Sequence, residues 1–138
     1  MYLVSACLVG INCKYDGGNN YNEKVLELVK TGKAIPVCPE QLGGLTTPRK
    51  PSEIVNDKVV MNNGEDVTSN FKRGAEEVLE LCKKLNVTKV ILKSGSPSCG
   101  CGTIYDGTFT GTKVPGNGIT TSLLLKNGIE VITEKDLA

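Results

Sequence analysis

Three cysteines lie in short loops at the ends of predicted β-strands, a placement that is typical of a metal site. Cys7, Cys38 and Cys99 are far apart in the sequence. The loops that follow parallel strands nevertheless gather at the carboxyl edge of one sheet, so these thiols can meet in space. The chain has no histidine, so thiolates, carboxylates, hydroxyls, lysines or a bound cofactor must supply any reactive group. An all-cysteine ligand set favours an iron–sulfur cluster or zinc.

The other three cysteines differ from these in their sequence context. Cys82 falls on the apolar face of a predicted helix, where a free cysteine behaves as a small hydrophobic residue. Cys13 and Cys101 each lie within six residues of a predicted ligand, so either could be a fourth ligand, a resolving thiol, a sulfur-relay residue or a packing residue. The pattern Cys99-Gly100-Cys101 is C-x-C rather than the C-x-x-C of thioredoxin-like proteins or zinc knuckles.

Length and composition fit a single domain over residues 1–138. The chain is 39% hydrophobic, which is enough to bury a core without disulfide bonds. Sixteen Lys and Arg residues nearly balance 15 Asp and Glu residues, and aromatic residues are few. This composition disfavours binding to a nucleic-acid polymer. No apolar stretch is long enough for a membrane helix or a signal peptide, so we expect a cytoplasmic protein with reduced thiols and no membrane partner. The oligomeric state is left open.

Alternating strands and helices predict an α/β fold, a Rossmann-like three-layer sandwich with a mainly parallel four-stranded sheet. The strands are expected over residues 2–6, 34–37, 88–92 and 129–133, and the helices over residues 22–30, 70–85 and 119–126. Residues 54–55 and 59–61 flank a turn and predict a small inserted β-hairpin. The glycine-rich segments 8–20 and 100–118 are expected to be long loops, which tend to be functional.

Several short motifs occur in order along the chain. They are Ser5-Ala6-Cys7-Leu8-Val9-Gly10, Cys13-Lys14-Tyr15-Asp16-Gly17-Gly18, Cys38-Pro39-Glu40, Gly43-Gly44-Leu45, Pro48-Arg49, Ser96-Pro97-Ser98-Cys99-Gly100 and Ile104-Tyr105-Asp106-Gly107-Thr108-Phe109. Each motif is weak alone, but the ordered set reaches from the first strand to about Gly118. In this set the chain resembles the bacterial thiouracil desulfidase family, formerly a domain of unknown function.

The resemblance implies a [4Fe-4S] cluster held by three cysteines, which by motif are Cys7, Cys38 and Cys99. In that family the fourth iron has no protein ligand and binds the sulfur to be removed. The family also implies an acidic catalytic residue beside the middle cysteine, here Glu40, which could instead be a surface carboxylate or a helix cap. The implied substrate is a small thiolated pyrimidine, free or as a nucleoside, and no net electron transfer is needed to release sulfide.

Serines around the third cysteine are further catalytic candidates. A hydroxyl of Ser94, Ser96 or Ser98 could bond the nucleophilic water or a cluster sulfur, although turn formation in Ser-Pro segments explains these residues nearly as well.

Three charged residues are candidates for binding the substrate. Asp16 and Asp106 each precede glycine in Tyr-Asp-Gly, and either could bond a ring N–H or simply form a turn. Arg49 could hold a carboxylate or a ribose phosphate, or pair with Glu53 at the surface.

Two other kinds of function fit the same residues. One is a non-catalytic module that binds a metal or an iron–sulfur cluster, although a structural zinc site should have four ligands rather than three. The other is a thiol or persulfide sulfur-transfer protein that uses Cys99 and Cys101, which would require a thiolate of low pKa and no bound metal.

Overall fold

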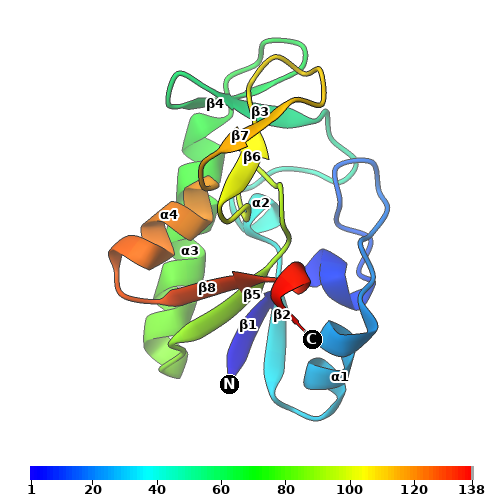
Figure 1. Cartoon of the computed structure of the whole chain (residues 1–138), viewed down its shortest axis with the longest axis vertical. Helices are drawn as coiled ribbons and strands as arrows, with labels where there is room; N and C mark the ends of the chain where they lie inside the picture. The colour runs from blue at the N-terminus through cyan, green and yellow to red at the C-terminus, as the bar shows by residue number, and fades with distance from the viewer. Residues whose placement is uncertain (138) are drawn as a thin grey trace.

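The computed structural model describes residues 1–137, and its centre is a four-stranded parallel sheet (Figure 1). The strands are β1 (Tyr2–Ser5), β2 (Ala34–Val37), β5 (Lys89–Leu92) and β8 (Glu130–Thr133), in the spatial order β2-β1-β5-β8. Pairs such as Leu3 with Val90 fix the register between β1 and β5. Both residues are fully buried, as expected for a parallel sheet that is covered on both faces.

Helices cover the two faces of this sheet and complete the three layers. On one face lie α3 (Thr68–Leu85) and α4 (Ile119–Lys126), which share a core with Leu3, Val90 and Leu92. On the other face lies α1 (Glu23–Lys30), whose Val25 packs with Val4 and Ile91. The three-layer α/β sandwich predicted from the sequence is therefore confirmed.

The helix boundaries follow from local hydrogen bonds. The side chain of Asn22 caps α1 by accepting from the backbone N–H of Lys24 and Val25, as expected for an N-cap asparagine. Helix α3 begins at Thr68, two residues earlier than expected, because the Asp66 carboxylate accepts from the N–H and the hydroxyl of Thr68. Asn86 ends α3 in the left-handed region.

Two antiparallel hairpins extend beyond the carboxyl edge of the sheet (Figure 1). The predicted hairpin is confirmed as β3 (Ser52–Val55) and β4 (Lys58–Met61), and its turn residues Asn56 and Asp57 both have positive φ, as in a type I′ turn. The second hairpin, β6 (Thr103–Tyr105) with β7 (Lys113–Pro115), lies in the segment predicted to be a long loop. That prediction was wrong, because three-residue strands among glycines are too short to show a period of two.

Short helical turns follow the strands at this edge. They are η1 (Ala6–Val9) after β1, α2 (Pro39–Leu42) after β2, and η2 (Glu134–Asp136) after β8. No helix within residues 1–137 is both long enough and apolar enough to cross a membrane.

Helix α2 is held against α3 by two glycines at a close backbone contact. A Cβ atom on Gly74 would lie 2.0 Å from the carbonyl oxygen of Pro39, and one on Gly43 would lie 2.0 Å from the carbonyl oxygen of Asn70. The Asn70 side chain also donates to the Gly43 carbonyl at 2.9 Å. This contact sets the position of α2, whose first turn carries Glu40.

We expect Gly74→Ala to lower the free energy of unfolding by about 2 kcal/mol. The new methyl group would force the two backbones apart, which outweighs the roughly 1 kcal/mol that alanine gains in a helix. Denaturant unfolding of the metal-free protein measures the change. Glu77→Ala, at an exposed position of the same helix, is the control and should not destabilise; an equal effect of the two substitutions would contradict the contact.

Candidate metal centre and active site

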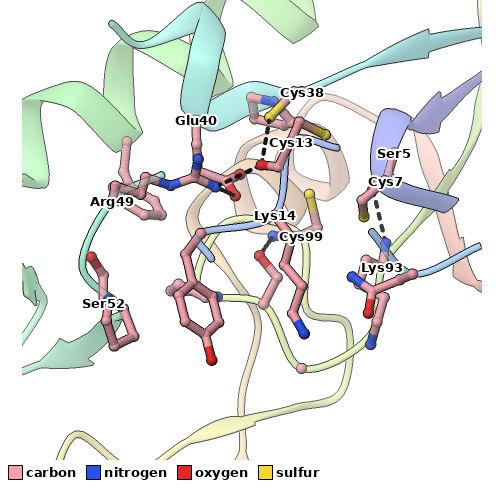
Figure 2. A pocket seen from close by; sticks show the side chains of 18 of the residues that line it. Ser5, Cys7, Cys13, Lys14, Cys38, Glu40, Arg49, Ser52, Lys93 and Cys99 are labelled. Carbon is pink, nitrogen blue, oxygen red and sulfur yellow. Dashed lines mark hydrogen bonds and ion pairs between the residues drawn. The ribbon is translucent and has the colours of Figure 1, made fainter. Parts of the chain in front are cut away.

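A cavity of about 480 Å³ opens at the carboxyl edge of the sheet, where β1, β2 and β5 end (Figure 2). Its volume is in the range of small-molecule sites. The chain order runs outward from β1 in both directions, to β2 on one side and to β5 on the other. The cavity therefore lies at the topological switch point, which is where open α/β sheets bind ligands.

The three predicted ligand cysteines all line this cavity. Cys7 lies in the first turn of η1, and Cys38 is the N-cap residue of α2. Cys99 lies in the loop after β5 and is 3% exposed. The fold therefore brings together thiols that follow three adjacent strands, as the sequence predicted.

The other cysteines take separate places. Cys82 is 1% exposed within the core beneath α3, so its predicted packing role is confirmed. Cys13 is buried and lines the cavity beside Cys38. Cys101 is not a lining residue; its thiol lies 3.8 Å from the Val131 carbonyl oxygen.

The environment of the cavity disfavours free thiolates at two of the three positions. Burial raises the pKa of both Cys7 and Cys99, and the nearby negative charges of Glu40 and of the other thiolates raise it further. The pKa of Cys38 is lowered, chiefly by a hydrogen bond with the Cys13 thiol, whose own pKa is raised. A bound cation would favour the thiolate form at all three positions.

Glu40 is positioned in the cavity wall by an ion pair. Its Oε2 accepts from Nη2 of Arg49 at 3.0 Å, and both side chains are mostly buried, at 16% and 6% exposed. Its Oε1 is buried and has no hydrogen-bond partner within residues 1–137. Burial raises the pKa of Glu40 even though the Arg49 charge opposes the shift. Glu40 is therefore not the surface carboxylate that was one alternative from the sequence.

Both terminal nitrogens of the Arg49 guanidinium are bonded within the protein. Besides Glu40, its guanidinium donates to the Cys13 carbonyl at 3.2 Å and to oxygen atoms of Thr46 and Thr47. The alternative that Arg49 pairs with Glu53 at the surface is wrong, because Glu53 instead accepts from the backbone N–H of Gly107 and Phe109.

Of the three predicted serines, Ser94 and Ser96 line the cavity, and both have their hydroxyls bonded within the protein. Ser98 is not a lining residue; it is fully buried, and its hydroxyl bonds that of Thr120 at 2.7 Å. Ser94 Oγ donates to Glu134 Oε2 at 2.9 Å. Ser96 Oγ accepts from the N–H of Ser98 at 3.1 Å and of Cys99 at 3.0 Å. Ser96 thus forms the turn that presents Cys99, which is the alternative that Ser-Pro turn chemistry offered.

Asp16 and Asp106 lie outside the cavity lining. Asp16 accepts from the Gly18 N–H at 2.9 Å, and Asp106 accepts from the N–H and hydroxyl of Thr108. The hydrogen bonds from Thr108 lower the pKa of Asp106. In the structure both aspartates therefore stabilise turns, which was the alternative to binding a ring N–H of the substrate.

Several lining residues were not predicted from the sequence. They are Ser5, Tyr15, Asn20, Lys50, Phe71, Lys93 and Tyr105, among others. Ser5 and Lys93 could have been found from the sequence, because Ser5 is the next-to-last residue of one predicted strand and Lys93 directly follows another. The aromatic residues come from segments whose approach to the cavity depends on tertiary packing.

The three thiols surround the cavity without meeting at one point. Within residues 1–137, no three or more His, Cys, Asp or Glu side chains are arranged to hold a metal ion together. The donor set therefore consists of separate thiols on a shared wall rather than a closed mononuclear site.

The fold and site define an α/β protein with a thiol-lined small-molecule cavity at the switch point of its sheet. The model of the 2-thiouracil desulfurase family matches residues 2–136, so the chain belongs to that family. It is similar to the solved structure of the "[4Fe-4S]-dependent thiouracil desulfidase TudS (DUF523Vcz)", with a TM-score of 0.94 and 45% identity over 99% of this chain and 91% of that one. It is also 46% identical to the uncharacterized protein YbbK of Bacillus subtilis (strain 168), over 99% of this chain and 97% of that protein. The family resemblance predicted from the motifs is confirmed.

We expect Arg49→Met to lower the free energy of unfolding by about 3 kcal/mol, because it leaves the buried Glu40 carboxylate without its cation. Adding Glu40→Gln to the same chain should recover most of this loss. Urea unfolding of the reduced, metal-free protein measures both changes.

Lys83→Met is the control, because Lys83 forms an exposed pair with Glu80 and should change stability by no more than about 0.5 kcal/mol. The account of the Glu40–Arg49 pair would be wrong if the double variant recovered nothing.

Proposed function

We propose that this protein is a [4Fe-4S]-dependent desulfidase that hydrolyses small thiolated pyrimidines, such as thiouracil or its nucleoside, to the uracil product and sulfide. The observation that carries the proposal is the gathering of Cys7, Cys38 and Cys99 around one cavity that also contains the buried Glu40. Membership of the 2-thiouracil desulfurase family and similarity to TudS support the same assignment.

The residues present fit an iron–sulfur cluster. Cys7, Cys38 and Cys99 would hold such a cluster, because a cluster of several irons could be bound by thiols that line one cavity without converging on a single metal ion. Burial and mutual repulsion disfavour thiolates at Cys7 and Cys99, and a cationic cluster core would offset this cost. Three cysteines leave one of four irons without a protein ligand. When bound, such a cluster supplies a soft Lewis acid that favours thiocarbonyl sulfur over carbonyl oxygen.

Glu40 is the proposed general base. The ion pair with Arg49 holds Oε2 and leaves Oε1 as the free acceptor for a proton from water. The water oxygen bonds to the C=S carbon as Glu40 takes one proton, and the C=S electron pair moves to sulfur. Glu40 returns that proton to the sulfur, the C–S bond breaks to release hydrosulfide, and the remaining hydroxyl proton is lost to solvent as the carbonyl of the uracil product forms. Burial raises the pKa of Glu40, so this carboxylate is a stronger base than an exposed one and is better suited to accept a proton from water.

The aromatic part of the wall suits a planar substrate. Tyr15, Phe71 and Tyr105 line the cavity, and aromatic faces stack on planar rings. Because Arg49 already makes several protein contacts, we assign it to orienting Glu40 rather than to binding a ribose phosphate.

The sulfur-transfer alternative receives less support. It needs a thiolate of low pKa at Cys99 or Cys101, whereas burial raises the pKa of both. The six cysteines are all free thiols, which agrees with a reducing compartment, and we propose a cytoplasmic location.

The cluster itself gives the first test of this function. Anaerobic reconstitution with iron and sulfide should yield about four irons per chain. Cys7→Ala, Cys38→Ala and Cys99→Ala should each abolish stable loading, while Cys82→Ala should load normally because that thiol lies in the core. Iron and sulfide analysis measures the outcome. Stoichiometric zinc that resists replacement by iron would rule out the cluster.

The reaction gives the second test. The loaded wild-type protein should convert 2-thiouracil or a 4-thiouracil derivative to the uracil product and sulfide without consuming a reductant. Glu40→Gln keeps the size of the side chain but cannot take a proton, so turnover should fall by roughly 10²-fold or more. Loss of thiocarbonyl absorbance and release of sulfide measure both rates.

Iron content must be equal in the two proteins, since an effect on loading would imitate an effect on proton transfer. If a fully loaded Glu40→Gln variant turns over as fast as the wild type, Glu40 is not the general base. If the loaded wild-type protein releases sulfide from none of the thiouracils, the desulfidase proposal is wrong and the non-catalytic cluster-binding module remains.

A further inference from the structure

A partly buried cation lies in the cavity wall on the side of Cys7, away from the Glu40–Arg49 pair. Figure 2 shows Lys93 beside Ser5 and Cys7, with Glu40 and Arg49 at the other side. Lys93 is the first residue after β5, and its side chain is 27% exposed. The Lys93 N–H donates to Ser5 Oγ at 2.9 Å, which ties the ends of β5 and β1 together.

The Lys93 ammonium is fixed by protein contacts. It donates to the Ser94 carbonyl at 2.8 Å and to Ser94 Oγ at 3.2 Å, and it lies 3.4 Å from Glu134 Oε2. The two hydrogen bonds to Ser94 and the ion pair with Glu134 together hold the ammonium in one position. Lys93 is therefore placed to act through a positive charge of fixed position.

Glu134 holds this arrangement from the end of the neighbouring parallel strand, β8. It lies in η2 directly after β8, and its two oxygens accept from the Ser94 N–H at 2.8 Å and from Ser94 Oγ at 2.9 Å. Burial would raise the pKa of Glu134, but the bonds from Ser94 and the charge of Lys93 more than offset it and the pKa is lowered. Glu134 is thus an ionised anchor that does not line the cavity.

The positive charge of Lys93 acts on groups within the cavity. Lys93 is a lining residue, and Figure 2 places it beside Cys7. In the proposed reaction a neutral thiocarbonyl gives an anionic sulfur species. A fixed positive charge in a site that is partly shielded from water stabilises the anionic state more than the neutral one.

We propose that Lys93, positioned by Glu134 and Ser94, is a fixed cation that stabilises hydrosulfide or another anionic sulfur ligand in the cavity. This inference rests on the proposed function and assigns a role that none of the motifs identified. Glu134 is a positioning residue in this account, because it acts only through Lys93 and Ser94.

Binding of sulfide to the anaerobically loaded protein tests the role of Lys93 without turnover. Titration with sodium sulfide, followed by cluster absorbance, gives the dissociation constant. Lys93→Met should weaken sulfide binding by roughly 10-fold or more through loss of the charge, and it should lower the reduction potential of the cluster. Lys93→Gln should do the same and serves if the Met variant loads poorly.

Glu134→Ala separates positioning from simple electrostatics. If Glu134 acted only as a nearby negative charge, removing it would tighten sulfide binding. If it holds Lys93 in place, its removal frees the ammonium to move into solvent, and sulfide binding should weaken by several-fold. Tighter binding in Glu134→Ala would overturn the positioning role.

The chain offers a matched control on the same two strands. Lys89 and Glu130 form an ion pair of 3.5 Å and are register partners in β5 and β8, at the end of the strands away from the cavity. Lys89→Met and Glu130→Ala should leave sulfide affinity and reduction potential unchanged.

The outcomes distinguish this inference from the proposed function. A wild-type protein that turns over thiouracil, together with unchanged sulfide affinity in a fully loaded Lys93→Met or Lys93→Gln variant, would overturn the inference alone. A loaded wild-type protein that binds sulfide in a Lys93-dependent manner but turns over no thiouracil would support the cation and remove the desulfidase assignment.

Discussion

The parallel pairing of β1 with both β2 and β5 is the constraint on which the site depends. This pairing brings three strand ends to one edge, and each end is followed by a short turn that carries a cysteine. A one-residue slip in a strand would exchange the side chains that face the two helical layers, so buried pairs such as Leu3 with Val90 also fix where the thiols lie. The packing of the hydrophobic core therefore fixes the positions of the cysteines at the edge of the sheet.

Two charged pairs shape the cavity from opposite sides. The Glu40–Arg49 pair directs one carboxylate oxygen away from the guanidinium, and the Lys93–Glu134 pair holds an ammonium beside Cys7. The first pair depends on the close approach of α2 to α3 at Gly43 and Gly74. Both pairs are mostly buried, so their charges are weakly screened and act strongly on groups within the cavity.

Much of the fold and of the thiol set could be predicted from the sequence. Apolar runs such as residues 88–92 predict buried strands, and Cys7, Cys38 and Cys99 each follow such a run. The motifs identified the family, and Glu40 came with them. Each of these features depends on residues that are neighbours in the sequence, so each could be predicted without the structure.

The remaining features depend on contacts between distant segments. Arg49 pairs with Glu40 rather than Glu53 because the loop that carries Arg49 brings its guanidinium to Glu40 in α2. The hairpin of β6 and β7 is too short to produce a clear pattern. The position of the Lys93 ammonium depends on Glu134, which comes from a distant part of the chain. Asp16 and Asp106 lie in turns, which the sequence could not separate from ligand contacts.

The central claim is that three protein thiolates bind a four-iron cluster and leave one iron open to the sulfur of the substrate. Mössbauer spectroscopy of protein loaded with ⁵⁷Fe tests this most directly, because it resolves irons with different ligands. The account predicts that about one quarter of the iron forms a distinct subsite, and that the signal of this subsite alone shifts when 2-thiouracil is added. Four equivalent irons, or a spectrum that 2-thiouracil leaves unchanged, would contradict the account.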